Sequence, residues 1–86
     1  MCVSRNVSSL LRLRVVADAD PGAIARVLER FQNLNVLPRR VAAEFGIGDI
    51  VHIEVDVFGV PEPQMELIAA KVRQSTCVSN AFWHRL

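Results

Sequence analysis

Two stretches of the chain alternate strictly between apolar and polar residues, and this alternation constrains the fold more than any other feature. One stretch runs from Leu11 to Val15, and the other runs from Val51 to Val57. A period of two is typical of β-strands that bury one face. The chain is therefore expected to contain a sheet with one apolar face and one polar face.

Two further stretches repeat apolar residues at the i, i+3, i+4, i+7 spacing of one helix face. The two apolar sets are Ile24, Val27, Leu28 and Phe31, and then Met65, Ile68, Ala69 and Val72. Asp20 followed by Pro21 predicts an N-cap and a first helical residue ahead of the first set. Residues 33–35 are expected to end that helix, since Asn tolerates a left-handed backbone.

The remaining residues predict two more strands. Alternation from Leu37 to Phe45 favours a strand, and Gly46 to Asp49 supplies a tight turn into the strand that follows. A last short strand is expected from Cys77 to Trp83, with an inward face that the pattern does not decide. Phe82 and Trp83 point to opposite sides of it, so one is expected in the core and the other at a partner contact.

The order of these elements is βαββαβ, which predicts an α+β, ferredoxin-like sandwich with sheet order 4-1-3-2 and both helices on one face. This order makes the first and third strands antiparallel neighbours. Arg12 and Arg14 then face Glu54 and Asp56, and opposite charges across paired strands are stabilising. We expect residues 9–86 to form one domain and residues 1–8 to be a flexible lead-in.

Composition argues against several classes of partner. The chain has 86 residues, 51% of them hydrophobic, and a formal net charge of +1. Near-neutrality does not favour nucleic acid, and the third strand carries acids where RNA-binding modules of this architecture carry aromatics. No stretch approaches the roughly 18 apolar residues of a membrane span. We therefore predict neither nucleic acid nor membrane as a partner.

The N-terminus and the two cysteines bear on location. Residues 1–16 contain three Arg and no acid, as an organellar transit peptide does, but the alternation from Leu11 favours a strand. Cys2 and Cys77 form no disulfide framework. These features fit a reduced, cytoplasmic setting.

No catalytic or metal-binding pattern is present. The acids at Asp18 and Asp20 flank a turn, and those on the third strand share an open face, whereas acid–base catalysis needs carboxylates in a pocket. His52, His84 and the two cysteines lack the spacing of metal ligands. We predict no catalytic residue, no metal and no cofactor. A small ferredoxin-like enzyme or carrier stays as the alternative, although an acylphosphatase would need Arg in the first loop and a metal carrier two close Cys.

The segment from Leu13 to Phe31 resembles the opening of an ACT domain, with a hydrophobic strand, an Asp-Pro-Gly turn and a helix with an apolar stripe. Asn35-Val36 resembles the Asn-Ile pair of that family, and the strand from Val51 to Val57 resembles its third strand. The resemblance covers Leu10 to the end. Length and second half look most like the short small subunit of acetolactate synthase.

This resemblance implies a non-enzymatic, allosteric regulatory protein. ACT domains pair side by side through the second strand and helix, and they bind amino acids between the first loop of one chain and the start of the second strand of the other. The positions carried over are Asp20, Gly22 and Ala23, then Asn35, Val36 and Leu37. The N–H groups of Gly22 and Ala23 would take the carboxylate, and Asn35 would take the amino group or a second oxygen.

The resemblance also implies partners. It implies a homodimer that binds an amino acid, such as a branched-chain one, or that serves as a small subunit of a large catalytic enzyme such as acetolactate synthase.

Overall fold

The computed structural model describes residues 9–86, so the predicted lead-in of residues 1–8 lies outside the described residues. Six elements follow one another in the predicted order. They are β1 (Leu10–Asp18), α1 (Ala23–Gln32), β2 (Arg40–Phe45), β3 (Ile50–Phe58), α2 (Glu62–Arg73) and β4 (Val78–Arg85).

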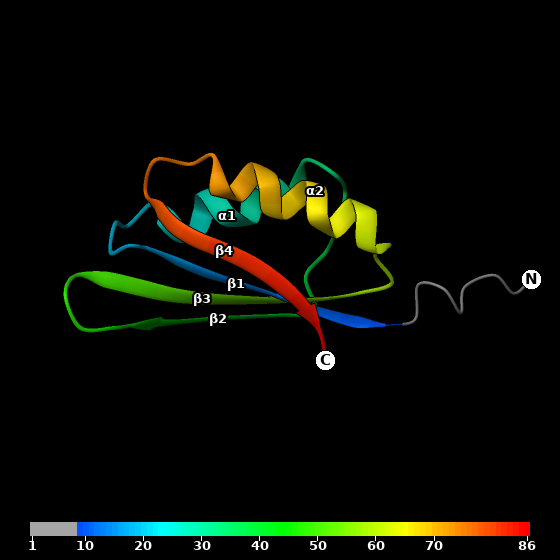
Figure 1. Cartoon of the computed structure of the whole chain (residues 1–86), viewed down its shortest axis with the longest axis horizontal. Coiled ribbons are helices and arrows are strands. Elements are labelled where there is room, and N and C mark those ends of the chain that lie inside the picture. Colours follow the sequence, from blue (N-terminus) through cyan, green and yellow to red (C-terminus); the bar gives the residue numbers. More distant parts are fainter. Residues whose placement is uncertain (1–8) are drawn as a thin grey trace, which may run out of the picture.

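The four strands form one antiparallel sheet in the order β2-β3-β1-β4, and both helices lie on one face of it (Figure 1). This is the predicted order read from the opposite edge. The ferredoxin-like βαββαβ architecture is therefore confirmed. β1 and β3 form the central pair, and β2 and β4 are the two edges.

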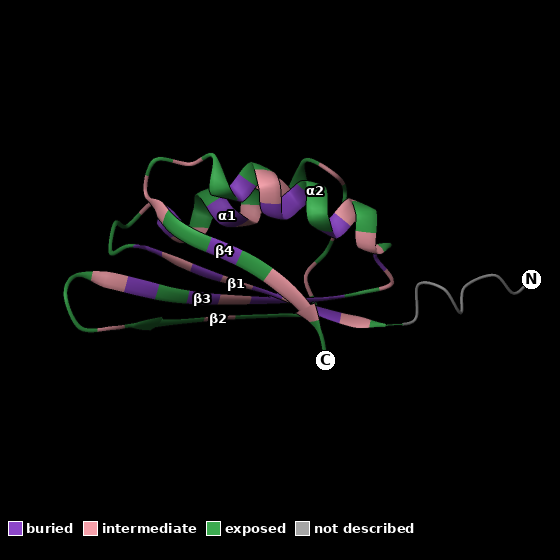
Figure 2. Cartoon of the chain, viewed as in Figure 1, coloured by how far each residue is buried: buried purple, intermediate pink, exposed green. Residues whose placement is uncertain are grey.

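The core lies between the sheet and the helices. Both predicted helix stripes face it, although Ile24 and Leu28 are only partly buried at its margin. In Figure 2 the buried segments alternate along β1 and β3, as a half-buried strand requires. The largest fully buried side chains are Phe31, Leu11, Leu13, Ile53, Met65 and Ile68.

The open face of the sheet carries the predicted charge pairs. Arg12 lies opposite Asp56 and Arg14 lies opposite Glu54 in the β1–β3 register. The Arg14 Nη1 to Glu54 Oε2 distance is 2.7 Å, and Arg40 from β2 reaches the same two carboxylates at 3.2 and 3.4 Å. These pairs agree with the β1–β3 register, in which opposite charges face each other.

The edge strand β4 is covered by side chains of α2. The Arg73 Nε donates a 2.8 Å hydrogen bond to the carbonyl of Ala81, and the Trp83 indole donates one of the same length to Glu66. Arg85 forms an ion pair with Glu62. Trp83 is thus the inward aromatic of β4, while Phe82 is 45% exposed on the open face of the sheet.

The other edge strand, β2, has no such cover. Val41, Ala43 and Phe45 lie on its helix-facing side, opposite buried residues of β3, yet Val41 is 41% exposed and Phe45 is 76% exposed. β2 lies at the side of the sheet away from the helices (Figure 1). We call the side chains of Val41, Ala43 and Phe45 the β2 strip.

Strand β2 begins at Arg40, three residues later than the alternation predicted. Pro38 has no N–H to give to the ladder, and the first β2-side donor is the N–H of Arg39, 2.6 Å from the carbonyl of Asp56. Leu37 therefore lies in the connection from α1, not in the strand.

Helix α1 also begins later than predicted. Its N-cap is Gly22, with φ −87°, and no side chain caps the helix. The carboxylate of Asp20 instead accepts a 2.6 Å hydrogen bond from Arg26. The predicted capping role of Asp20 is wrong, because a guanidinium one turn into the helix takes the carboxylate.

Within residues 9–86 no helix is both long and apolar enough to cross a membrane.

Candidate functional site

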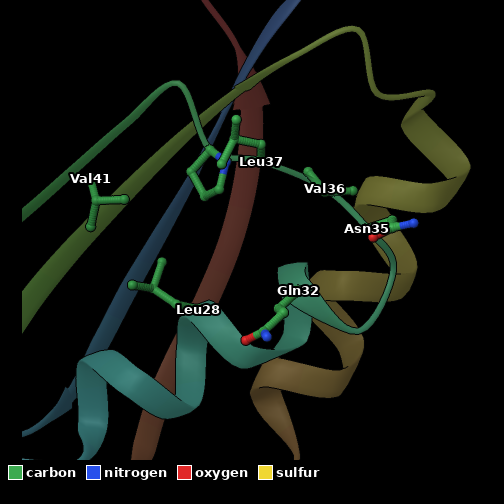
Figure 3. A pocket seen from close by; sticks show the side chains of 7 residues that line it. Leu28, Gln32, Asn35, Val36, Leu37 and Val41 are labelled. Carbon is green, nitrogen blue, oxygen red and sulfur yellow. The ribbon is translucent and has the colours of Figure 1, made fainter.

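A groove of about 530 Å³ lies where α1 ends, between that helix and β2 (Figure 3). We call it the Asn35 groove. Its lining is mostly apolar, with the amides of Gln32 and Asn35 as its polar side chains. The lining residues are Leu28, Gln32, Asn35, Val36, Leu37, Pro38 and Val41.

The backbone at the end of α1 explains this groove. Asn35 has φ 60°, a left-handed conformation that Asn tolerates, as the sequence predicted. The N–H of Val36 returns to the carbonyl of Phe31 at 2.9 Å, which holds Val36 against the core. The chain then leaves the helix with Leu37 almost fully exposed.

A second groove of about 350 Å³ lies at the other end of α1, and we call it the loop groove. It is lined by Ala19, Asp20, Pro21, Ile24, Phe45 and Val51. The two grooves flank the two ends of the β2 strip, since Val41 lines one and Phe45 lines the other.

Arg26 in the first part of α1 places an exposed cation beside the loop of this second groove. Arg26 Nη1 lies 2.6 Å from Asp20 Oδ2 and 3.8 Å from the Cys77 sulfur. The hydrogen bond that Arg26 donates to Asp20 raises the pKa of Arg26. The guanidinium also lies 3.4 Å from the point where a Cβ on Gly22 would stand. An anion that approaches Gly22 would meet this guanidinium and compete with Asp20 for it.

The six predicted binding residues fall into two separate sets. Asn35, Val36 and Leu37 together line the Asn35 groove, whereas Asp20 lines the loop groove. A ten-residue helix separates the two sets by about 15 Å, so a single chain does not bring them together.

Gly22 and Ala23 could offer only backbone groups to a ligand. Ala23 is fully buried, and its N–H already donates to the carbonyl of Asp20 at 2.9 Å. Gly22 is partly exposed at the helix start. Of the two N–H groups that were expected to take a carboxylate, that of Ala23 is occupied within the chain.

Sequence reasoning did not assign several lining residues of the two grooves to the site, among them Leu28, Gln32, Val41 and Phe45. Leu28 reads as core because it completes the apolar stripe of α1. The available signal was the inward position of Val41 and Phe45 on a strand that the predicted order places at the sheet edge. Inward side chains of an edge strand are the ones that a two-helix layer leaves uncovered.

Among residues 9–86 no group of three or more His, Cys, Asp or Glu side chains is placed to hold a metal ion.

No protein-family model matches the chain, and no curated protein matches it. Solved structures do. The C-terminal domain of the MgtC protein from Mycobacterium tuberculosis is similar with a TM-score of 0.76 and 14% identity, over 93% of this chain and 89% of that domain. The ACT domain of GTP pyrophosphokinase from Chlorobium tepidum gives 0.72 and 17%, over 91% and 97%.

A homoserine dehydrogenase from Thiobacillus denitrificans gives a TM-score of 0.76 and 18% identity. The match covers 96% of this chain but only 18% of that much longer one. At these identities the comparisons show a shared fold. The chain has an ACT-like fold.

Proposed function

We propose that the chain is a regulatory ACT domain that pairs with a second copy through β2 and binds an amino acid between the two copies. The observation that carries this proposal is the exposed β2 strip with a groove at each end. The Asn35 groove holds one of the two residue sets that the ACT resemblance assigns to the ligand, and the loop groove holds Asp20 of the other set.

The two residue sets, which lie apart within one chain, can meet across the interface of a dimer. A two-fold axis that pairs β2 with the partner's β2 in antiparallel fashion sets each end of the strand against the opposite end. The Asn35 groove of one copy then lies near the loop groove of the other. The ligand site is complete only in this dimer.

The choice of β2 over β4 follows from the two sheet edges. Unpaired strand edges attract another strand. On β4 the carbonyl of Ala81 already accepts from Arg73, and two further side-chain contacts with α2 lie along that strand. β2 lacks such a cover and is the edge open to a second copy.

The lining of the Asn35 groove favours a neutral aliphatic amino acid. Leu28, Val36 and Val41 offer apolar surface to a branched side chain, and the amides of Gln32 and Asn35 can hydrogen-bond the polar head group. A charged side chain would meet no opposite charge in this lining. The loop groove of the partner adds Asp20, whose carboxylate accepts a hydrogen bond from Arg26.

A dimer of this kind is suited to control a larger enzyme. One structural neighbour is an ACT domain of an enzyme, GTP pyrophosphokinase. We propose that this chain regulates a large catalytic subunit of amino-acid biosynthesis, such as that of acetolactate synthase. Phe82, exposed on the open sheet face, is the aromatic available for that contact.

Calorimetry against the twenty amino acids tests the proposal, combined with sedimentation velocity of the same samples. We expect heat from aliphatic amino acids, a dimer in the micromolar range, and loss of the heat in Asn35→Ala. Leu67→Ala, an exposed apolar residue on α2, is the matched control and should bind like the parent. A monomer that binds none of the twenty would refute the proposal.

A further inference from the structure

The hydrogen-bonding directions of β2 are fixed by the hairpin that follows it. The N–H of Gly46 donates to the carbonyl of Ile50 at 2.9 Å, so these two residues form a hydrogen-bonded pair. Such pairs alternate with non-bonded pairs along an antiparallel ladder. The even-numbered residues of β2 therefore turn their backbone groups toward β3. The odd-numbered residues, those of the β2 strip, turn theirs toward the free edge.

A second copy can pair with this edge in two registers that keep most of β2 engaged. The sheet stays continuous only where side chains of the same face meet, so the two-fold axis passes through Ala42 or through Ala43. An axis at Ala42 sets Arg40 opposite the partner's Glu44. An axis at Ala43 sets Val41 opposite the partner's Phe45.

Burial of apolar surface decides between the two registers. An exposed ion pair contributes little to association, and Arg40 is already held by Glu54 and Asp56. Covering Phe45 and Val41 removes a large aromatic and a branched side chain from water, and that gain grows with the area covered. The Ala43 register is therefore the more stable one.

Charge complementarity survives in the Ala43 register. The partner's Glu44 lies opposite Ala42, which is one position along the same face from Arg40. Diagonal neighbours on paired strands lie within reach of long side chains. Glu44 is exposed and enters no ion pair among the described residues, so it is available to the partner's Arg40. The Ala43 register thus sets no like charges opposite each other, and this weak diagonal attraction adds to the apolar burial that decides the register.

We propose that the second copy aligns on β2 with Ala43 opposite the partner's Ala43, and that the partner's Phe45 closes the Asn35 groove. The inference rests on the dimer proposed above and adds a residue to its ligand site. In this register the partner's Phe45 lies opposite Val41, which lines the Asn35 groove. In its own chain, Phe45 also lines the loop groove. One side chain therefore joins the two half-sites.

The register predicts which cysteines can form a disulfide between copies. In a background of Cys2→Ser and Cys77→Ser, we would prepare Ala42→Cys and Glu44→Cys separately. The Ala43 register makes residue 42 and the partner's residue 44 a non-bonded pair, with Cα atoms about 4.5 Å apart, inside the range of a disulfide. Each variant alone brings its cysteines only to diagonal positions, about 7–8 Å apart.

Oxidation of the mixed variants should give at least ten times more cross-linked dimer than either variant alone. Rapid cross-linking of Ala42→Cys alone would establish the Ala42 register and overturn the inference. A dimer that cross-links in none of these samples, or a monomer at every concentration, would also overturn it.

Phe45→Ala tests the role of the aromatic ring. We expect a folded chain whose dimer dissociates at least ten times more readily and whose affinity for a bound amino acid falls at least tenfold. Phe82→Ala, also exposed and aromatic but on the open face of the opposite edge strand, is the matched control and should change neither. Phe45→Leu should restore part of the affinity, since it restores part of the covered area.

The results separate this inference from the proposed function. Cross-linking of the mixed variants without amino-acid binding would refute the proposed ligand binding and would still support the Ala43 register. Amino-acid binding by a chain that fails to cross-link, or that is indifferent to Phe45→Ala, would refute the register and the role of Phe45.

Discussion

The carboxylate of Asp56 accepts two hydrogen bonds from the guanidinium of Arg12, one from Nε at 2.7 Å and one from Nη2 at 3.0 Å. Asp56 is only 4% exposed, although it lies on the open face of the sheet. The arginines beside it supply its hydrogen bonds and its counter-charge. Asp56 is thus a buried charge whose two-point pairing with Arg12 joins β1 to β3.

Replacement of Asp56 by Asn should lower the free energy of unfolding by about 1–3 kcal/mol, because Arg12 then loses a charged, two-point partner. Urea unfolding at neutral pH measures this loss. Glu54→Gln is the control, since Glu54 also meets arginines but is more exposed. An equal loss in both variants would contradict the special position of Asp56.

The stability of the parent should fall at low pH through the same carboxylate. The hydrogen bond from Arg12 lowers the pKa of Asp56, and the charges of Arg12 and Arg40 lower it further. A lowered pKa adds stability above the unfolded-state value of about 4, and this stability is lost as the pH falls through the folded value. The difference between parent and Asp56→Asn should therefore shrink between pH 5 and pH 2. An unchanged difference would contradict the pKa shift.

Gly22→Ala should not destabilise the fold. Gly22 has φ −87°, which Ala adopts freely, and its new methyl would meet only the flexible end of Arg26. A gain of about 0.4–1 kcal/mol is expected from the stiffer unfolded chain. Gly48→Ala is the matched contrast, since φ +87° should cost about 1–2 kcal/mol even in open space.

The same Gly22→Ala variant should bind an amino acid at least tenfold more weakly, because a methyl blocks close approach to the backbone. Calorimetry beside urea unfolding separates the two effects. Unchanged affinity would remove Gly22 from the ligand site.

Ala43→Pro should yield a folded monomer. The N–H of Ala43 faces the free edge, so its loss removes a bond to the partner but none within the chain. Ala42→Pro instead removes a bond to β3 and should destabilise the fold by about 3 kcal/mol. Sedimentation and circular dichroism of both variants check this contrast, and a persistent Ala43→Pro dimer would exclude pairing through β2.

Trp83→Ala should destabilise the chain by about 2–4 kcal/mol, since it removes core packing and the bond to Glu66. Phe82→Ala should cost less than about 1 kcal/mol, because Phe82 is exposed. In a pull-down from the native host, Phe82→Ala should lose a partner enzyme that the parent retains. Equal recovery by both would place the enzyme contact elsewhere.

The sequence predicted most of the fold because local pattern and long-range charge agree. The stripe from Met65 to Val72 is buried as expected, and Arg14 meets Glu54 across strands that are far apart in the chain. Periodicity predicts which face of each element is buried, and the opposite charges agree with a strand order that makes β1 and β3 neighbours.

Local pattern could not predict contacts decided by distant side chains. Asp is a residue type that commonly caps helices, but the carboxylate of Asp20 accepts a hydrogen bond from Arg26 instead. Phe82 and Trp83 are equivalent in the alternation, and Glu66 on α2 distinguishes them. The site was therefore predictable only in part. The residue type of Asn35 indicates a left-handed backbone, whereas the role of Phe45 depends on β2 being an edge strand of the folded sheet.

The hydrogen bond that Arg73 donates to the carbonyl of Ala81 occupies a backbone acceptor at the β4 edge, and this opposes the addition of another strand there. A sheet with two open edges could polymerise without limit at both sides, whereas this chain offers one. When β2 of one copy meets β2 of another, the outer strands of the eight-stranded sheet are both β4. Further copies would find no free β2 to join, so the proposed dimer should not grow into filaments at high concentration.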